Sequence, residues 1–194
     1  YAVNCKLTTD ITVSEPLEKY SGFIEGNGHT ITLNLTKSNL YYSLIRYGYS
    51  IITIRNLNVK GVVSGSNYCA GLIGMLSNDM ANLTVENCHV SANISTSNDG
   101  YAAGFVANAN SGKVPLRNCL FDGNVSFTGL NSYSMVASFV NRSHRAQDMT
   151  VENCLENGTY NGYNNVVAVG YYDGNSHKAW DGGINVWTYA TTGF

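Results

Sequence analysis

A ten-residue phrase recurs four times in this chain and constrains its fold more than any other feature. The copies are SIITIRNLNV (50–59), ANLTVENCHV (81–90), GKVPLRNCLF (112–121) and QDMTVENCLE (147–156). They share a pivot asparagine, which recurs after 31, 31 and 35 residues at Asn56, Asn87, Asn118 and Asn153. A fixed period of this size indicates stacked copies of one supersecondary unit.

The segments between these phrases predict an all-β fold. Short β-branched runs bounded by Asn, Gly and Ser dominate, among them YCAGLIGM (68–75) and VSANIST (90–96), and no helical apolar stripe is visible. Each repeat therefore holds three short strands. Stacking them in parallel predicts a right-handed parallel β-helix, a solenoid of about five to six coils with atypical capping ends.

The whole chain, 1–194, is expected to form one β-helix module. Residues 1–36 carry a looser version of the pattern and are expected to form the entry coil, and residues 37–171 hold the repeats. Residues 172–194 match no repeat, which indicates either a C-terminal cap or the start of a next module.

Alternation within the phrase predicts which side chains line the interior. One inward column should contain Ile54, Val85, Leu116 and Val151. A second should contain Leu57, Cys88, Cys119 and Cys154. We interpret the cysteine column as buried thiols that act as small hydrophobic groups. The chain has no paired Cys-x-x-Cys spacing and no matching histidine column, so no metal site is expected.

The pivot and the residue before it predict two ladders along the outside of the coil. Asparagine tolerates the left-handed backbone conformation, so the pivots should form a corner at which side-chain amides bond from coil to coil. The preceding position reads Arg55, Glu86, Arg117 and Glu152, with the sign alternating at every step. Such a column favours one register, because a one-coil slip places like charges together; chance alternation is the other explanation.

Four stretches resemble bacterial surface proteins with GLUG-type β-helix repeats. The opening CKLTTDITV and GFIEGNGHTITLNL, followed by the AGLIG and AGFVA segments, occupy residues 5–13, 22–35, 70–74 and 103–107. Such modules occur in adhesins and in non-catalytic regions of immunoglobulin-cleaving metallopeptidases. The resemblance covers about residues 1–171 and implies an extracellular bacterial setting, at the cell surface or secreted, within a polypeptide that has other domains. It carries over no catalytic residue.

Charge and motif content argue against several function classes. The net charge of −2 gives no electrostatic reason to expect nucleic acid or an anionic membrane as a partner. No apolar run approaches the roughly 20 residues that span a bilayer. The aspartates fall at unrelated repeat positions, and neither a metallopeptidase motif nor a nucleophile-elbow motif is present. We therefore expect no catalysis and no cofactor, and a polysaccharide-degrading β-helix enzyme remains the less favoured alternative.

Tyrosine provides the candidate ligand-binding residues, since the chain has 14 of them. One recurs ahead of each Ala-Gly segment, and a further pair lies one coil earlier; the set is Tyr68, Tyr101, Tyr133 and Tyr163 with Tyr41 and Tyr42. Tyrosine supplies rigid contact area for a host protein or glycan. The alternative is that stacked tyrosines only cover a corner of the coil. The expected function is an extracellular binding or adhesion module, and a passive spacer is the runner-up.

Overall fold

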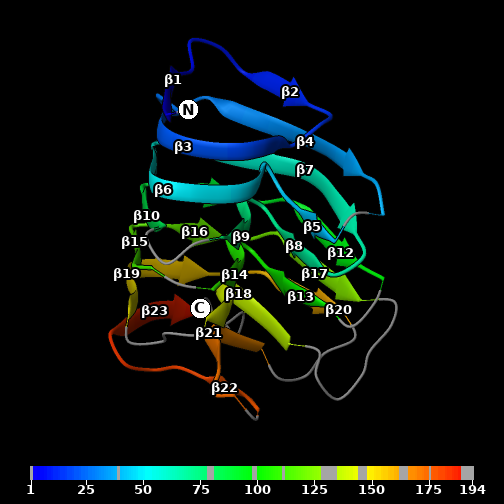
Figure 1. The fold of residues 1–194 in the computed structure, drawn as a ribbon, viewed down its shortest axis with the longest axis vertical. Coiled ribbons are helices and arrows are strands. Elements are labelled where there is room, and N and C mark those ends of the chain that lie inside the picture. The colour runs from blue at the N-terminus through cyan, green and yellow to red at the C-terminus, as the bar shows by residue number, and fades with distance from the viewer. Residues whose placement is uncertain are drawn as a thin grey trace, which may run out of the picture.

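The computed structural model is a right-handed parallel β-helix (Figure 1). It describes residues 2–38, 40–77, 81–97, 100–110, 112–127, 135–143, 148–161, 166–174 and 176–188. Each coil has three sides, and strands of successive coils pair in parallel on each side. The sequence prediction of stacked three-sided coils is thereby confirmed. Two of the sides are more broken than expected, because each is divided into two short strands in the middle coils.

Face 1 begins each coil. Its strands, in order along the axis, are β1 (Ala2–Lys6), β3 (Leu17–Glu25), β6 (Ile45–Arg55), β10 (Asn82–Glu86), β15 (Val114–Arg117), β19 (Met149–Glu156) and β23 (Ile184–Thr188). Strands β3 and β6 start on the preceding face and turn onto face 1. Strand β19 runs on from face 1 to face 2, where Leu155 pairs with Leu120.

Face 2 follows the corner that the pivot asparagines occupy. Its strands are β2 (Ile11–Val13), β4 (Thr30–Thr36), β7 (Asn58–Gly65), β11 (His89–Val90), β12 (Asn93–Thr96), β16 (Leu120–Phe121), β17 (Asn124–Phe127) and β20 (Thr159–Asn161).

Face 3 closes the coil. Its strands are β5 (Tyr41–Tyr42), β8 (Tyr68–Ala70), β9 (Ile73–Leu76), β13 (Tyr101–Ala103), β14 (Val106–Ala109), β18 (Met135–Ser143) and β21 (Val166–Tyr172). After β21 the chain turns back as β22 (His177–Ala179), which pairs antiparallel with β21, and then adds β23 to the end of face 1.

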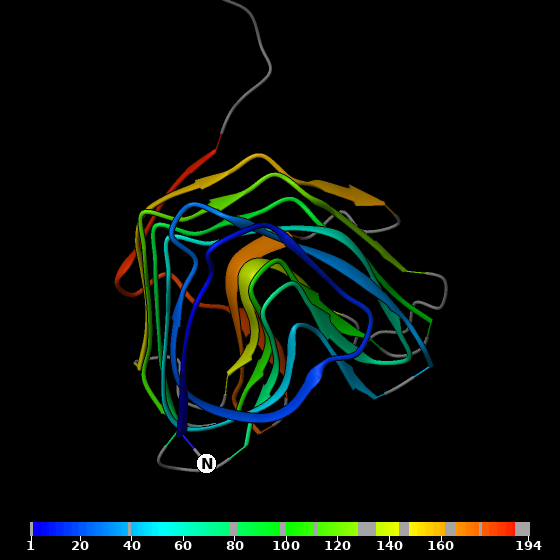
Figure 2. The same cartoon turned by 90° about the horizontal axis from the view of Figure 1, so that it is seen from above.

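Face 3 is bent inward, so that each coil is pinched in the middle (Figure 2). The bend falls between β8 and β9 and between β13 and β14, at Gly71 and Gly104. A Cβ at Gly104 would lie 2.2 Å from the carbonyl oxygen of Ser138 and 2.5 Å from the Phe121 ring of face 2. Glycine is needed there because the apex of the bend packs directly against the opposite wall. We call this inward bend the crease.

The interior is filled by columns that run the length of the solenoid. The column predicted on face 1, Ile54, Val85, Leu116 and Val151, is in register from strand to strand and fully buried. Because side chains alternate along a strand, the same register turns every second residue outward. One column of packed side chains therefore fixes the position of the polar ladders outside it.

Candidate functional site

The pivot asparagines form a corner between faces 1 and 2. Asn56, Asn87, Asn118 and Asn153 all have φ between 52° and 53°, the left-handed conformation that asparagine tolerates. The Nδ2 of Asn118 donates to Oδ1 of Asn87, and the Nδ2 of Asn87 donates to Oδ1 of Asn56, each at 3.1 Å. The Nδ2 of Asn56 donates at 2.9 Å to a carboxylate, Oε1 of Glu25. We call this set the asparagine corner.

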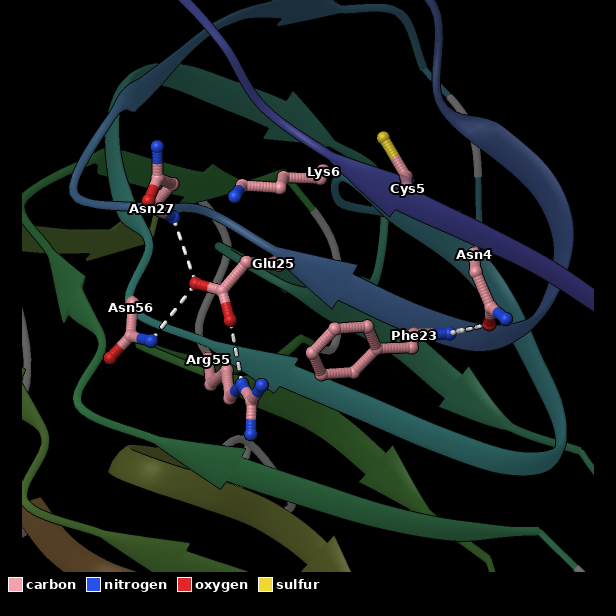
Figure 3. A pocket seen from close by; sticks show the side chains of 8 residues that line it. All are labelled: Asn4, Cys5, Lys6, Phe23, Glu25, Asn27, Arg55 and Asn56. Carbon is pink, nitrogen blue, oxygen red and sulfur yellow. Dashed lines mark hydrogen bonds and ion pairs between the residues drawn. The ribbon is translucent and has the colours of Figure 1, made fainter.

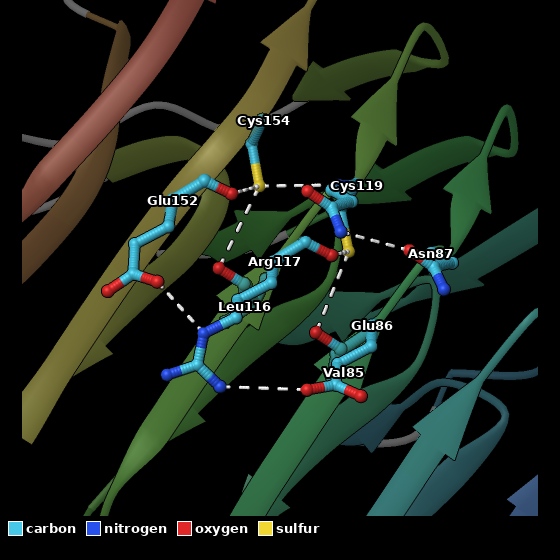
Figure 4. A network of polar contacts seen from close by, with 9 residues as sticks. Val85, Glu86, Asn87, Leu116, Arg117, Cys119, Glu152 and Cys154 are labelled. Carbon is cyan, nitrogen blue, oxygen red and sulfur yellow. Dashed lines mark hydrogen bonds and ion pairs between the residues drawn. The ribbon is translucent and has the colours of Figure 1, made fainter.

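The charged column lies beside this corner (Figure 4). Arg117 stands between two carboxylates, with its Nε 2.8 Å from Oε2 of Glu152 and its Nη1 3.6 Å from Oε1 of Glu86. The hydrogen bond to Glu152 raises the pKa of Arg117 above its usual value. Arg55 pairs with Glu25 on the other side, Nε to Oε2, at 2.6 Å.

Two charges at the top of this column were missed by the sequence analysis. Glu25 lies across from Arg55 in the strand register, and Lys6 lies across from Glu25, so the alternation extends through the first coil. The coil that contains Glu25 has a longer corner, with positive φ at Asn27 and Gly28. An alignment on the pivot asparagine cannot place Glu25, because no pivot follows it directly.

A surface pocket of about 430 Å³ opens over this first corner (Figure 3). Phe23 and Arg55 line it together, with the guanidinium 4.6 Å from the centroid of the ring. Asn56, Arg55 and the Asn27 amide all donate to Glu25, and these bonds hold its pKa below the ordinary value, the Asn56 bond most of all. Because Glu25 is already engaged by three donors, we interpret this pocket as part of the charged column.

The cysteines of the second inward column are buried. Cys88 and Cys119 are each 2% exposed, and Cys154 is fully buried. All five cysteines are free thiols. Burial raises the pKa of Cys88 to about 12, and that of Cys69 likewise to about 12, so these thiols stay protonated and are unsuited to nucleophilic chemistry.

Three tyrosines stack in the crease, and we call them the tyrosine column. The rings of Tyr41 and Tyr68 are 4.6 Å apart between centroids, with 16° between their planes. Tyr68 and Tyr101 are 4.9 Å apart, with 12° between planes. Tyr68 is only 8% exposed. Both of its ring faces are covered, so it cannot offer a flat face to a sugar ring.

The small residues of the Ala-Gly segments explain why the rings fit. Tyr68 packs with Ala70 and Ala107, which come from the two sides of the crease. A Cβ at Gly74 would lie 3.2 Å from Cβ of Tyr41. Larger side chains at these positions would therefore push the rings out of the crease.

Arg142 ends the column, and sequence analysis did not single it out. Its guanidinium carbon lies 5.2 Å from the ring centroid of Tyr101 and 5.1 Å from that of Tyr172. Its Nη1 donates to the Tyr68 hydroxyl at 2.7 Å. At the opposite end Arg46 lies 5.3 Å over the ring of Tyr47 and pairs with Glu18 at 3.1 Å.

The other expected tyrosines do not join this column. Tyr42 is fully buried in the core, because neighbouring strand residues point to opposite faces, so the prediction that it contacts a ligand is wrong. The position across from Tyr101 in the next coil is Met135, not a tyrosine. Tyr133 and Tyr163 lie outside the described residues.

The described part of the chain contains no candidate metal centre. No group of three or more His, Cys, Asp or Glu side chains there could hold a metal ion. The carboxylates Glu86 and Glu152 flank Arg117 as ladder members. The described residues also contain no helix with the length and hydropathy to span a bilayer.

Comparisons with known proteins give one structural likeness. No family model matches the chain, and no curated protein matches it. A solved structure described as "a putative immunoglobulin A1 protease from Bacteroides ovatus" is similar with a TM-score of 0.47 and 15% sequence identity. The match covers 98% of this chain and 78% of that chain.

Proposed function

We propose that this chain is a non-catalytic binding module of a larger bacterial surface or secreted protein. In this proposal the crease is the recognition surface, and it contacts an acidic group of a host protein or glycan. The extracellular bacterial setting rests on the resemblance of the sequence to GLUG-type repeat proteins. The recognition surface rests on the charges and rings of the crease.

Arg142 is the observation that carries the proposal. Among the described arginines, Arg46, Arg55 and Arg117 form salt bridges with carboxylates, whereas no salt bridge joins Arg142 to a described carboxylate. Its guanidinium is held instead between two aromatic rings, which fixes its orientation without neutralising its charge. A planar, oriented guanidinium suits the bidentate recognition of a carboxylate or a sulfate.

The tyrosines would contribute edges and hydroxyl groups to such a contact. The ring faces within the column are occupied by neighbouring rings, whereas Tyr41 and Tyr101 are half-buried and keep part of their surface in solvent. Tyrosine edges and hydroxyls are adaptable contact groups that lose little entropy on binding. The ligand would lie across the crease with its acidic group at Arg142.

A binding screen with matched variants tests the proposal. The purified chain is screened against neutral and acidic glycans and against host secreted proteins. Replacing Arg142 by Gln should weaken any acidic hit at least about tenfold, ~1.4 kcal/mol. Tyr68→Phe removes the hydroxyl that Arg142 bonds but keeps the charge, so it should weaken binding less.

Arg117→Gln is the control on the opposite side of the coil. It removes the same type of charge from the more exposed ladder and should leave the affinity unchanged. If Arg142→Gln binds as tightly as Arg117→Gln, the crease is not the recognition surface.

A passive spacer is the second candidate, and one observation favours it. Tyr68 is almost wholly buried between two rings, so the column has a structural role that needs no ligand. Under this alternative no glycan or protein in the screen binds reproducibly, and Arg142→Gln alters only the stability of the fold.

A further inference from the structure

The first coil of the solenoid has no described strand stacked on its outer side. Strands β1 and β2 lie at this end, and each pairs on one side only, β1 with β3 and β2 with β4 (Figure 1). On face 3 the outermost segment is the start of β3, residues 17–20, which pairs with β6. We call the surface formed by these three segments the open end. It presents a free strand edge on every face of the coil.

Three apolar side chains, one on each face, point into the interior at the open end and yet are exposed. They are Val3 on face 1, Ile11 on face 2 and Leu17 on face 3. The apolar residues that follow in the same three columns are Ile52, Ile31 and Ile45. Those three are at most 3% exposed, whereas Val3, Ile11 and Leu17 are 51%, 37% and 41% exposed. The interior columns therefore reach the open end without a cover.

The backbone of β1 adds free hydrogen-bonding groups to this apolar surface. The Leu7 amide donates to the Glu25 carbonyl of the neighbouring coil at 2.9 Å. Alternate residues of a parallel strand bond to the same neighbour, so the N–H and C=O groups of Asn4 and Lys6 are directed to the free side. A row of such groups on an exposed edge is a template to which another extended segment can pair.

The charged column also ends at this surface. Lys6 lies across from Glu25, and Glu25 lies across from Arg55. Glu25 is bonded to Arg55 and Asn56, and no salt bridge joins Lys6 to a described carboxylate. Because the sign alternates from coil to coil, the position above Lys6 is one that an acidic side chain matches.

The opposite end of the solenoid is closed on face 3. There β22 turns back and pairs antiparallel with β21, so it occupies the edge that a further coil would use. Trp180 packs against the core at this end, and its amide donates to the Val169 carbonyl at 2.9 Å. Head-to-tail stacking of a second copy of this chain is blocked by the same hairpin.

We propose that the open end is a docking surface for an extended segment of a partner protein, which adds to the solenoid as one further coil by β-strand pairing. The segment has apolar residues at alternate positions that cover Val3 and Ile11. Its next outward position on face 1 carries a carboxylate that lies over Lys6. This inference does not depend on the crease, because it uses a different surface of the molecule.

A peptide copied from the chain itself serves as the probe. Residues 81–96, ANLTVENCHVSANIST, have the required pattern, since Leu83 belongs to the column of Val3 and Glu86 to the column of Lys6. The peptide carries a fluorescein group at its N-terminus, and its one cysteine is changed to alanine to prevent oxidation. Its fluorescence anisotropy should rise saturably as the purified chain is added. A peptide of the same composition in scrambled order should show no such rise.

A charge exchange tests the carboxylate over Lys6. Lys6→Glu in the protein places two carboxylates together and should weaken binding of the peptide about tenfold, because like charges in an interface are unfavourable. A peptide with Glu86→Lys should lose affinity for the wild-type chain in the same way. The Lys6→Glu protein and the Glu86→Lys peptide together should recover most of the original affinity.

A pair of substitutions at opposite ends of the solenoid tests the apolar contact. Val3→Lys places a charge where the added coil must pack and should abolish binding of the peptide. Trp187→Lys changes another exposed apolar residue, in the last strand, and should leave binding unchanged. Far-ultraviolet circular dichroism checks the fold of both variants. If Val3→Lys does not fold, the charge exchange at the exposed Lys6 decides the question by itself.

Four outcomes overturn the proposal. One is that the peptide gives no saturable change, which would leave Lys6 as a charge that protects a free edge from aggregation. Another is that the exchanged pair recovers no affinity. The third is that Val3→Lys and Trp187→Lys weaken binding equally. The fourth is a dimer of the wild-type chain in analytical ultracentrifugation that Val3→Lys abolishes, which would assign the open end to a second copy.

Discussion

The asparagine corner and the crease repeat in the same coils but are built in different ways. At the corner four successive coils, from Asn56 to Asn153, use the same residue with nearly the same φ. In the crease the equivalent positions read Tyr41, Tyr68, Tyr101 and Met135, so the residue type changes along the column. At the corner the residue type is determined by the left-handed backbone conformation within each coil. In the crease it is determined by packing against the adjacent coils, and more than one side chain can fill that space.

This difference predicts how each region responds to substitution. The stability of a corner variant should depend on whether the new residue tolerates a left-handed backbone and on the loss of the side-chain amide. The stability of a crease variant should depend on the side-chain volume that the substitution removes.

The largest effect is expected in the crease, at the centre of the tyrosine column. Tyr68→Ala removes a ring that two neighbours stack upon and leaves a gap over Ala70 and Ala107. Loss of a buried aromatic ring costs about 4 kcal/mol of unfolding free energy. Urea unfolding followed by circular dichroism measures the loss.

Tyr68→Phe is the matched control. It keeps the ring and removes only the hydroxyl to which Arg142 donates, so it should cost about 1 kcal/mol. Equal destabilisation by Tyr68→Ala and Tyr68→Phe would show that the hydroxyl, and not the volume of the ring, stabilises the crease.

The next effect separates the backbone of the corner from its side chain. Asn87→Val places a β-branched residue at φ 53° and removes two amide bonds of the ladder. The left-handed conformation costs an ordinary residue about 1–2 kcal/mol, and lost hydrogen bonds add to this, so we expect about 3 kcal/mol.

Asn87→Gly removes the same amide but accepts the same φ, and it should cost about 1 kcal/mol. Unfolding curves of the two variants give the comparison. If glycine destabilises the fold as much as valine does, the corner depends on the amide ladder and not on the backbone conformation.

The same contrast explains how much of the molecule could be predicted from the sequence. The corner was predictable because left-handed φ selects asparagine in each copy, whatever its neighbours are. Glu25 was not predicted as a member of the charged column because the first corner is longer and has its positive φ values at Asn27 and Gly28. In that coil the spacing between the charge and the next strand differs from the spacing in the others.

The crease was harder to predict because its register depends on two coils at once. Tyr68 and Tyr101 were placed correctly in one column, but Tyr42 was assigned to the surface although it faces the core. A sequence does not reveal which of two adjacent tyrosines points inward until the bend of face 3 is known. Arg142 shows the same problem, because its contact with Tyr68 joins residues 74 positions apart.

A smaller effect is expected in the charged column beside the corner. Arg117→Gln removes the cation between Glu86 and Glu152. Both ion pairs of Arg117 are exposed to solvent, so the loss of unfolding free energy should be slight at low ionic strength. It should vanish in concentrated salt, which screens exposed ion pairs. Thermal unfolding in low and high salt measures the difference.

Lys60→Gln is the control for net charge, since Lys60 is exposed and takes part in none of the salt bridges among the described residues. The Lys60→Gln variant should show no salt-dependent loss of thermal stability. A salt-independent loss in Arg117→Gln would mean that packing of its alkyl chain, and not its charge, supports the column.

The smallest effect is a pH dependence that belongs to the corner and not to the crease. The pKa of Glu25 is lowered from 4.5 in the folded chain, first by the Asn56 amide and then by Arg55. The unfolded chain therefore binds this proton more readily than the folded chain. The stabilisation is present above pH 4.5 and is lost as the pH falls through the lowered pKa of the folded state.

The melting temperature is followed from neutral to acidic pH, and its decrease on the acidic side is called the acid limb. Glu25→Gln should make the acid limb less steep in this pH range. Asn56→Gly keeps the left-handed backbone but removes the amide, so it should reduce the same slope in part. Tyr68→Phe alters the crease alone and should keep the wild-type slope. If Tyr68→Phe flattened the acid limb as Glu25→Gln does, the two regions would be coupled through the core, and the contrast between a local corner and a cooperative crease would fail.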